Sequence, residues 1–143
     1  MKYPAKYWSS HSEVRVNFDK HRFRLDFVAV VRWSFKRPKD IFILEIKSSL
    51  HDFESDNKWE NYLNFAHFFC FAIPEDNSEL IKAVEMNSFN FVGILLINLE
   101  DKSIKIHRKP IKQNPQHSCL LYENLYERVL GWGRLDVDSH VMK

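Results

Sequence analysis

Three apolar runs constrain the fold of this chain more than any other feature of its sequence. They occupy residues 41–46, 68–73 and 91–97, and they are rich in Ile, Leu and Phe. Runs of this length suit central strands of a sheet that is covered on both faces. Because the segments between them have helical patterns, we predict an α/β fold with a mixed sheet flanked by helices.

The segments around these runs supply the remaining elements. Residues 13–18 alternate between apolar and polar side chains, and 22–33 form a second strand-like segment after a turn at 19–21, so the pair predicts a hairpin. Ser49 and Asp52 have the spacing of a capping box, which predicts a helix start there. The other predicted elements are helices over 49–66, 78–86 and about 117–130 and a strand over 103–108.

Length and composition indicate one domain inside the cell. The chain has 143 residues, and we assign 1–133 to the domain and 134–143 to a polar C-terminal tail. Cys70 and Cys119 have no metal-ligand spacing, which favours a reducing compartment. The N-terminus has no apolar signal region, and the run 91–97 is far too short to cross a bilayer. We therefore expect a cytoplasmic protein with no membrane partner.

Charged residues interrupt two of the predicted strands. Asp26 lies in the second strand, and Glu45 and Lys47 lie in the third, where alternation places them on one face. Two neighbouring carboxylates repel each other unless a cation lies between them. Mg²⁺ prefers such oxygen ligands, and the Ile46 carbonyl could supply another. With Lys47 to orient a water or steady developing charge, this pattern fits metal-dependent phosphodiester hydrolysis.

Each of these patterns also has a purely structural interpretation. Glu-x-Lys on a strand commonly marks a solvated face of alternating charge. On a helix over 49–66, His51, Ser55, Lys58 and Tyr62 would share one stripe. Its first members would reach the site and Lys58 could contact a phosphate, but Lys58 could equally be a surface lysine. Two basic groups could follow a phosphate backbone or simply be solvated: Arg22, Arg24, Arg32, Lys36, Arg37 and Lys39, and Lys105, His107, Arg108, Lys109 and Lys112.

The arrangement of these motifs resembles a known superfamily. Arg24-Leu25-Asp26 followed by Glu45-Ile46-Lys47 is similar to the core motif of the PD-(D/E)XK nucleases. The continuation through Asp52-Phe53, 56–59, Tyr62 and 71–74 resembles the MmcB-like DNA-repair branch, and the resemblance covers about residues 13 to 112. Two features depart from the superfamily pattern. Leu25 replaces the usual proline, and the usual N-terminal helix must be short or missing.

The resemblance implies a fold, an activity and a substrate. It implies a restriction-endonuclease-like fold with a four-stranded mixed core sheet, and Mg²⁺ or Mn²⁺ held by Asp26 and Glu45. Lys47 would be catalytic and DNA the substrate, with Arg24, His51 and Lys58 as substrate-binding candidates. A non-catalytic nucleic-acid-binding module and an interaction subunit with a vestigial site are the alternatives on the same fold. We also expect a homodimer or a partner protein, because one small domain contacts little duplex.

Overall fold

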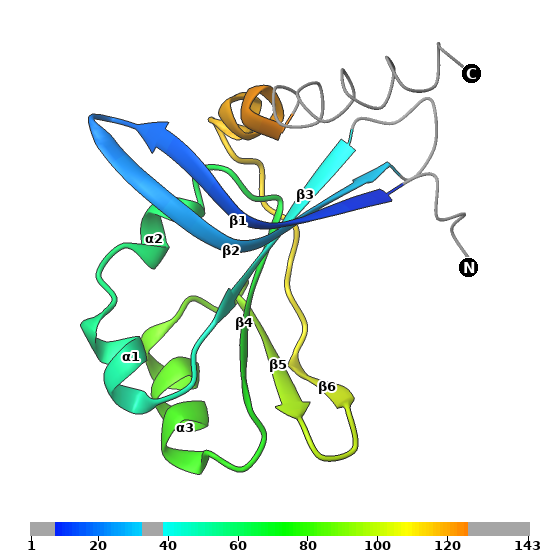
Figure 1. The fold of residues 1–143 in the computed structure, drawn as a ribbon. Helices are drawn as coiled ribbons and strands as arrows, with labels where there is room; N and C mark the ends of the chain where they lie inside the picture. Colours follow the sequence, from blue (N-terminus) through cyan, green and yellow to red (C-terminus); the bar gives the residue numbers. More distant parts are fainter. Residues whose placement is uncertain (1–7, 33–38, 126–143) are drawn as a thin grey trace.

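The sheet of this protein is mixed and has six strands that follow one another in sequence order, from β1 to β6 (Figure 1). The structure is a computed structural model that describes residues 8–32 and 39–125. Its strands are β1 (Trp8–Phe18), β2 (His21–Arg32), β3 (Lys39–Ile46), β4 (Phe68–Pro74), β5 (Gly93–Asn98) and β6 (Ser103–Arg108). Its labelled helices are α1 (Leu50–Ser55), α2 (Trp59–Tyr62) and α3 (Ser78–Asn87).

The strand directions confirm the predicted mixed α/β fold. Strands β1, β2 and β3 pair antiparallel, β3, β4 and β5 pair parallel, and β6 returns antiparallel to β5. The three apolar runs form β3, β4 and β5, the adjacent inner strands of the sheet. The parallel pairs are connected through helices, and Figure 1 shows α1, α2 and α3 on the same side of the sheet. The resemblance implied a four-stranded core sheet, and the observed sheet has six strands.

The predicted hairpin is present and begins earlier than the alternating pattern indicated. Asp19 and Lys20 form its turn with φ values of 50° and 65°. Two successive left-handed residues match the right-handed twist of the strands that they join. The first described residue, Trp8, already belongs to β1, so the described part of the chain contains no helix before the hairpin.

The core lies between the sheet and the helices and is rich in aromatic rings. Phe65 and Phe71 are fully buried, and Trp59 stacks on Phe69 and meets Phe71 edge to face. Leu121 and Leu125, from a helical segment over 118–125, are also buried. The end of the predicted last helix, the tail from 134 and the basic residues Lys36 and Arg37 lie outside the described residues.

The prediction of one helix over 49–66 is wrong. Its capping-box start is partly confirmed, because the Ser49 hydroxyl accepts from the Asp52 N–H at 3.1 Å. The helix ends at Ser55, and a short second helix begins at Trp59. The carboxylate of Asp56 causes the break, since its Oδ1 accepts from the N–H groups of Lys58 and Trp59 at 2.7 and 3.1 Å. The stripe that the continuous helix predicted therefore does not exist.

The β1–β2 hairpin leaves the sheet partway along its length. Pairing between β2 and β3 ends at Phe27 and Leu44, and the rest of the hairpin curves away over α2 (Figure 1). The buried side of β2 changes at the same point, because Leu25 is buried and the next fully buried residue is Val28. On the partner strand, Glu13 has a φ of 50° there. A fork therefore opens between β2 and β3 beside the carboxyl end of β3.

No helix in the described part of the chain is long and apolar enough to cross a bilayer.

Candidate active site

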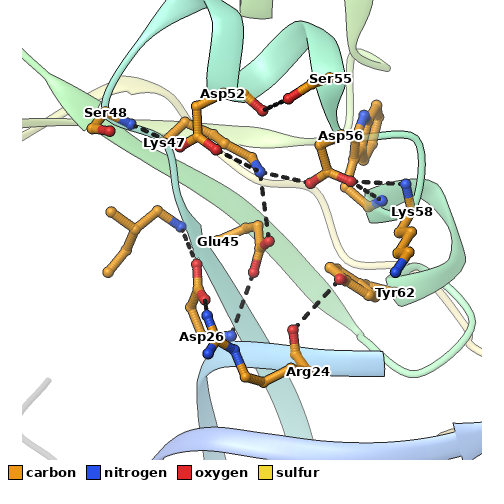
Figure 2. A network of polar contacts seen from close by, with 12 residues as sticks. Arg24, Asp26, Glu45, Lys47, Ser48, Asp52, Ser55, Asp56, Lys58 and Tyr62 are labelled. Atoms are coloured by element: carbon orange, nitrogen blue, oxygen red, sulfur yellow. Dashed lines mark hydrogen bonds and ion pairs between the residues drawn. The ribbon is translucent and has the colours of Figure 1, made fainter. Parts of the chain in front are cut away.

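Asp26 and Glu45 meet at the fork between β2 and β3 (Figure 2). Where backbone pairing stops, the two side chains continue it. The Asp26 N–H donates to Oε1 of Glu45 at 3.4 Å, and the Ile46 N–H donates to Oδ2 of Asp26 at 2.9 Å. The sequence predicted that these carboxylates would be neighbours, and the structure brings them together on the same side of the sheet.

The proximity of the two carboxyl groups has an electrostatic cost. Burial, with the negative charge of Asp26 adding to it, raises the pKa of Glu45 from 4.5 to about 8. Only 5% of Glu45 is exposed. A hydrogen bond between the two carboxyl side chains raises this pKa further, and the positive charge of Lys47 opposes the increase. The raised pKa favours a protonated Glu45 at neutral pH, whereas a cation bound beside it would favour the ionised form.

Lys47 is a buried cation surrounded by carboxylates. It lies one residue beyond β3, where its N–H still pairs with the Ala72 carbonyl at 3.0 Å. Its Nζ is 2.6 Å from Asp56, 3.8 Å from Glu45 and 4.0 Å from Asp52. Because only 6% of Lys47 is exposed, these carboxylates replace the water that an ammonium group otherwise requires. Lys47 thus joins Asp26 and Glu45 at one site, as predicted.

Asp56 is a site residue that our interpretation of the sequence missed. One oxygen holds Lys47, and the other caps the start of α2. Its side chain is 11% exposed, against 46% for Asp52. The signal that could have revealed it is the charge of Lys47 itself, because a lysine predicted on a buried strand requires a carboxylate partner from a nearby segment.

Tyr62 connects α2 to the arm of the fork that carries Arg24. Its hydroxyl donates to the Arg24 carbonyl at 3.4 Å. Burial, followed by the negative charges of Glu45, Asp56 and Asp26, raises the pKa of Tyr62 and keeps the hydroxyl protonated. Tyr62 is therefore a fixed hydrogen-bond donor and a core anchor, and 4% of it is exposed.

The three substrate-binding candidates differ in their relation to this site. Arg24 is 57% exposed at its side chain and lies 4.0 Å from Oδ1 of Asp26, so it is at the edge of the site. Lys58 joins the network through its backbone N–H, and its side chain is exposed at the N-terminal end of α2. His51 is exposed on α1. Within the described contacts, no side-chain interaction connects Lys58 or His51 to Asp26, Glu45 or Lys47.

The oxygen atoms at the fork could supply only part of the coordination shell of a divalent cation. Ile46 donates its N–H toward Asp26, and in an extended strand the carbonyl of a residue points to the same side as its N–H. This places the carbonyl on the side of the two carboxylates. In the described ranges, no group of three or more His, Cys, Asp and Glu side chains is arranged to hold a metal. Water or substrate oxygens would have to complete the shell, as is usual for Mg²⁺.

The comparisons with known proteins point to one family and one fold. The family model for DNA repair protein MmcB-like matches residues 16–86, which include Asp26, Glu45, Lys47 and Asp56. No curated protein matches the chain. Among solved structures, a protein of unknown function from Silicibacter pomeroyi has a similar fold with a TM-score of 0.63. It is 20% identical, and the match covers 92% of this chain and 82% of that protein.

Proposed function

We propose that this protein is a metal-dependent nuclease of the PD-(D/E)XK type that hydrolyses phosphodiester bonds in DNA. The observation that carries the proposal is the meeting of three groups at the fork. The Asp26 N–H donates to the Glu45 carboxyl group, the Ile46 N–H donates to the Asp26 carboxyl group, and the Nζ of the buried Lys47 lies 3.8 Å from Glu45. A pair of carboxylates that is destabilised by its own charge has a physical reason to bind a divalent cation.

The same three residues have distinct roles in the proposal. Asp26, Glu45 and the Ile46 carbonyl would hold Mg²⁺ or Mn²⁺, which supplies charge neutralisation and a bound water of lowered pKa. Lys47 donates hydrogen bonds to the developing negative charge or orients the attacking water. Asp56 keeps the Lys47 side chain in place from the opposite side at 2.6 Å, so it acts as a positioning residue. Arg24, at the exposed edge, contacts the phosphate backbone.

The choice of DNA as substrate is supported by the family match. The matched family is described as DNA repair proteins, and its model covers the whole polar network around Lys47. Membership of the superfamily and of this branch both enter here as part of the proposal. A restriction-endonuclease-like fold agrees with the observed mixed sheet, in which the site lies beside the carboxyl end of β3.

The test is cleavage of DNA by the purified chain and by matched variants. We expect cleavage of plasmid and of short single- and double-stranded oligonucleotides with Mg²⁺ or Mn²⁺, and none in EDTA. Glu45→Gln and Lys47→Met should each lower the rate by about a hundredfold or more, the usual loss when a transition-state stabiliser is removed. Asp40→Asn is the matched control, because Asp40 is also buried on β3 but lies at the opposite end of the strand.

Three results would count against the proposal. Full activity in both Glu45→Gln and Lys47→Met would reject the site, and equal loss in Asp40→Asn would reject the specificity of the effect. Salt-dependent DNA binding with no cleavage by the native chain would favour the non-catalytic module instead. Circular dichroism of each variant establishes that the fold is retained.

A further inference from the structure

A groove lies beside the proposed site, between the tip of the hairpin and the start of α2. The cavity has a volume of about 350 Å³. From the hairpin it is lined by His21 and Arg22, and from the other side by Asn57, Lys58 and Asn61. Because β2 has already separated from β3, the groove lies along an edge of β2 that is not paired with β3. On this edge the Tyr62 hydroxyl donates a hydrogen bond to the Arg24 carbonyl.

The charges around the groove are not balanced by the protein itself. Within the described residues, no ion pair joins the side chain of Arg22 or Lys58 to a carboxylate. Arg24, which lies outside the groove lining, differs from them because it is 4.0 Å from both Glu13 and Asp26. Asp19 is the one carboxylate among the described residues that line the groove. An anionic ligand would supply the missing counter-charge for Arg22 and Lys58.

The spacing of the side chains suggests a path for such a ligand. Asp26, Arg24 and Arg22 follow one another along β2 at intervals of two residues, which is roughly 6.6 Å in an extended strand. This interval is close to that of successive phosphates in an extended nucleic-acid strand. Arg24 is 4.0 Å from Asp26, so the path begins at the carboxylate pair and leads to the groove through Arg22.

We propose that the groove binds an unpaired nucleotide of a single-stranded DNA segment that continues from the phosphate at Asp26 and Glu45. This inference rests on the proposed function and adds a substrate class to it. The volume suits a ligand of nucleotide size rather than a duplex. The amide of Asn57 can donate to and accept from a base edge, which is accessible when the base is unpaired. The Nδ2 of Asn61 already donates to the Lys58 carbonyl at 3.1 Å, which leaves its second N–H and its oxygen for a ligand. Arg22 and Lys58 contact the phosphates on either side.

Binding measurements on an inactive background test the groove without requiring turnover. Fluorescence anisotropy in EDTA would compare a labelled 12-nucleotide single strand with its blunt duplex, using the chain that carries Glu45→Gln. The groove variant adds Arg22→Ala and Lys58→Ala. The matched control adds Lys82→Ala and Lys102→Asn, which remove the same charge from exposed positions outside the groove lining and outside both basic groups. Asn is chosen at position 102 because it tolerates the positive φ of 56° there.

We expect the single strand to bind more tightly than the duplex and the groove variant to lose that preference. The slope of log affinity against log salt should fall by about 1.4 in magnitude, since each phosphate contact with a single strand contributes about 0.7. The control should keep both the affinity and the slope of the background. Equal behaviour of the groove and control variants, or tighter binding of the duplex, would overturn the inference.

The two proposals fail in different ways. If the native chain cleaves no DNA but DNA binding still depends on the groove residues, the nuclease assignment is wrong and the groove assignment is retained. If the native chain cleaves DNA and the groove variant binds the single strand like the control, the groove assignment is wrong and the nuclease stands.

Discussion

The two ends of strand β3 both contain buried charge, but they balance it differently. At the amino end, Asp40 is 3% exposed and pairs with Lys112 at 3.2 Å. At the carboxyl end, the carboxylates of Glu45, Asp52 and Asp56 lie within 4.0 Å of Lys47, and those of Glu13 and Asp26 lie 4.0 Å from Arg24. One end therefore has an ion pair of matched charge, and the other has more carboxylates than cations.

This difference distinguishes a structural polar cluster from a candidate active site. Near Asp40, burial lowers the pKa of His67, so its neutral ring can accept from the Ile41 N–H at 2.9 Å. Tyr122 donates to the Lys39 carbonyl at 2.6 Å. The contacts of Lys112 and Tyr122 join the segment after β6 to the start of β3. At the carboxyl end the carboxylates outnumber the cations, and burial raises the pKa of Glu45, which is the kind of perturbation that makes a cluster a functional-site candidate.

The largest expected effect is the loss of the carboxylate that holds Lys47. Asp56→Ala should lower the free energy of unfolding by about 3–5 kcal/mol, because it leaves a buried cation without its nearest partner. Urea denaturation measures this effect. Asp52→Ala is the matched control. Its side chain is 46% exposed and 4.0 Å from Lys47, so we expect a loss of about 1 kcal/mol or less.

The Asp56→Asn variant separates the two roles of that side chain. The amide oxygen can still cap α2 but cannot neutralise Lys47. If this variant is as stable as the native chain, the ion pair contributes little and the cap accounts for the effect of Asp56→Ala.

A divalent cation should stabilise the protein by binding at the carboxyl end of β3, and it should have no effect at the amino end. At a concentration of Mg²⁺ or Mn²⁺ a hundredfold above its Kd, the free energy of unfolding should rise by about 2.7 kcal/mol. Asp26→Asn should abolish this gain, while Lys112→Ala should retain it. Thermal unfolding with and without the cation measures the gain in stability. An equal gain in the native and Asp26→Asn chains would refute a site at the fork.

The ion pair at the amino end should matter for stability and not for activity. Lys112→Ala leaves Asp40 buried without this partner and should cost about 1–3 kcal/mol. The rate of DNA cleavage at saturating cation should be unchanged once the variant is folded. A selective loss of activity in a stable Lys112→Ala protein would show that both ends of β3 contribute to function.

The smallest expected effect is the pH dependence that Glu45 contributes. Its pKa is raised to about 8 in the folded chain, so the folded state binds its proton more tightly than the unfolded state does. The stability that this proton provides is full below the unfolded value of 4.5 and is lost as the pH rises through about 8.

Between pH 7 and 8 without metal, the loss should be at most about 1.4 kcal/mol, the value of one group over one pH unit. Glu45→Gln has no such proton, so its stability should change less over this range. Urea denaturation at the two pH values compares the chains. Parallel changes in both would show that another group is responsible.

Much of the fold could be predicted from local patterns. The three apolar runs identified the inner strands, and the alternating segments identified the hairpin and β6. The prediction of β4 succeeds because all five of its inner residues are buried and a strand buried on both faces must be apolar along its length, whereas in β5 burial is complete only at Gly93 and Ile94. The prediction of one helix over 49–66 failed because a side-chain oxygen of Asp56 replaced the continuing helical hydrogen bonds.

The sequence by itself determined which residues could do chemistry, because a carboxylate or an ammonium group in an apolar strand is costly without a partner. It specified Asp26, Glu45 and Lys47, together with a mixed sheet to hold them. Only the tertiary structure decided how they meet. The fork on the N-terminal side of Phe27, the change of buried side between Leu25 and Val28, and the choice of Asp56 as the partner of Lys47 all depend on the path of the hairpin and α2 around the end of β3. Local periodicity contains no information about such contacts, since they join segments whose separation in sequence does not fix their separation in space.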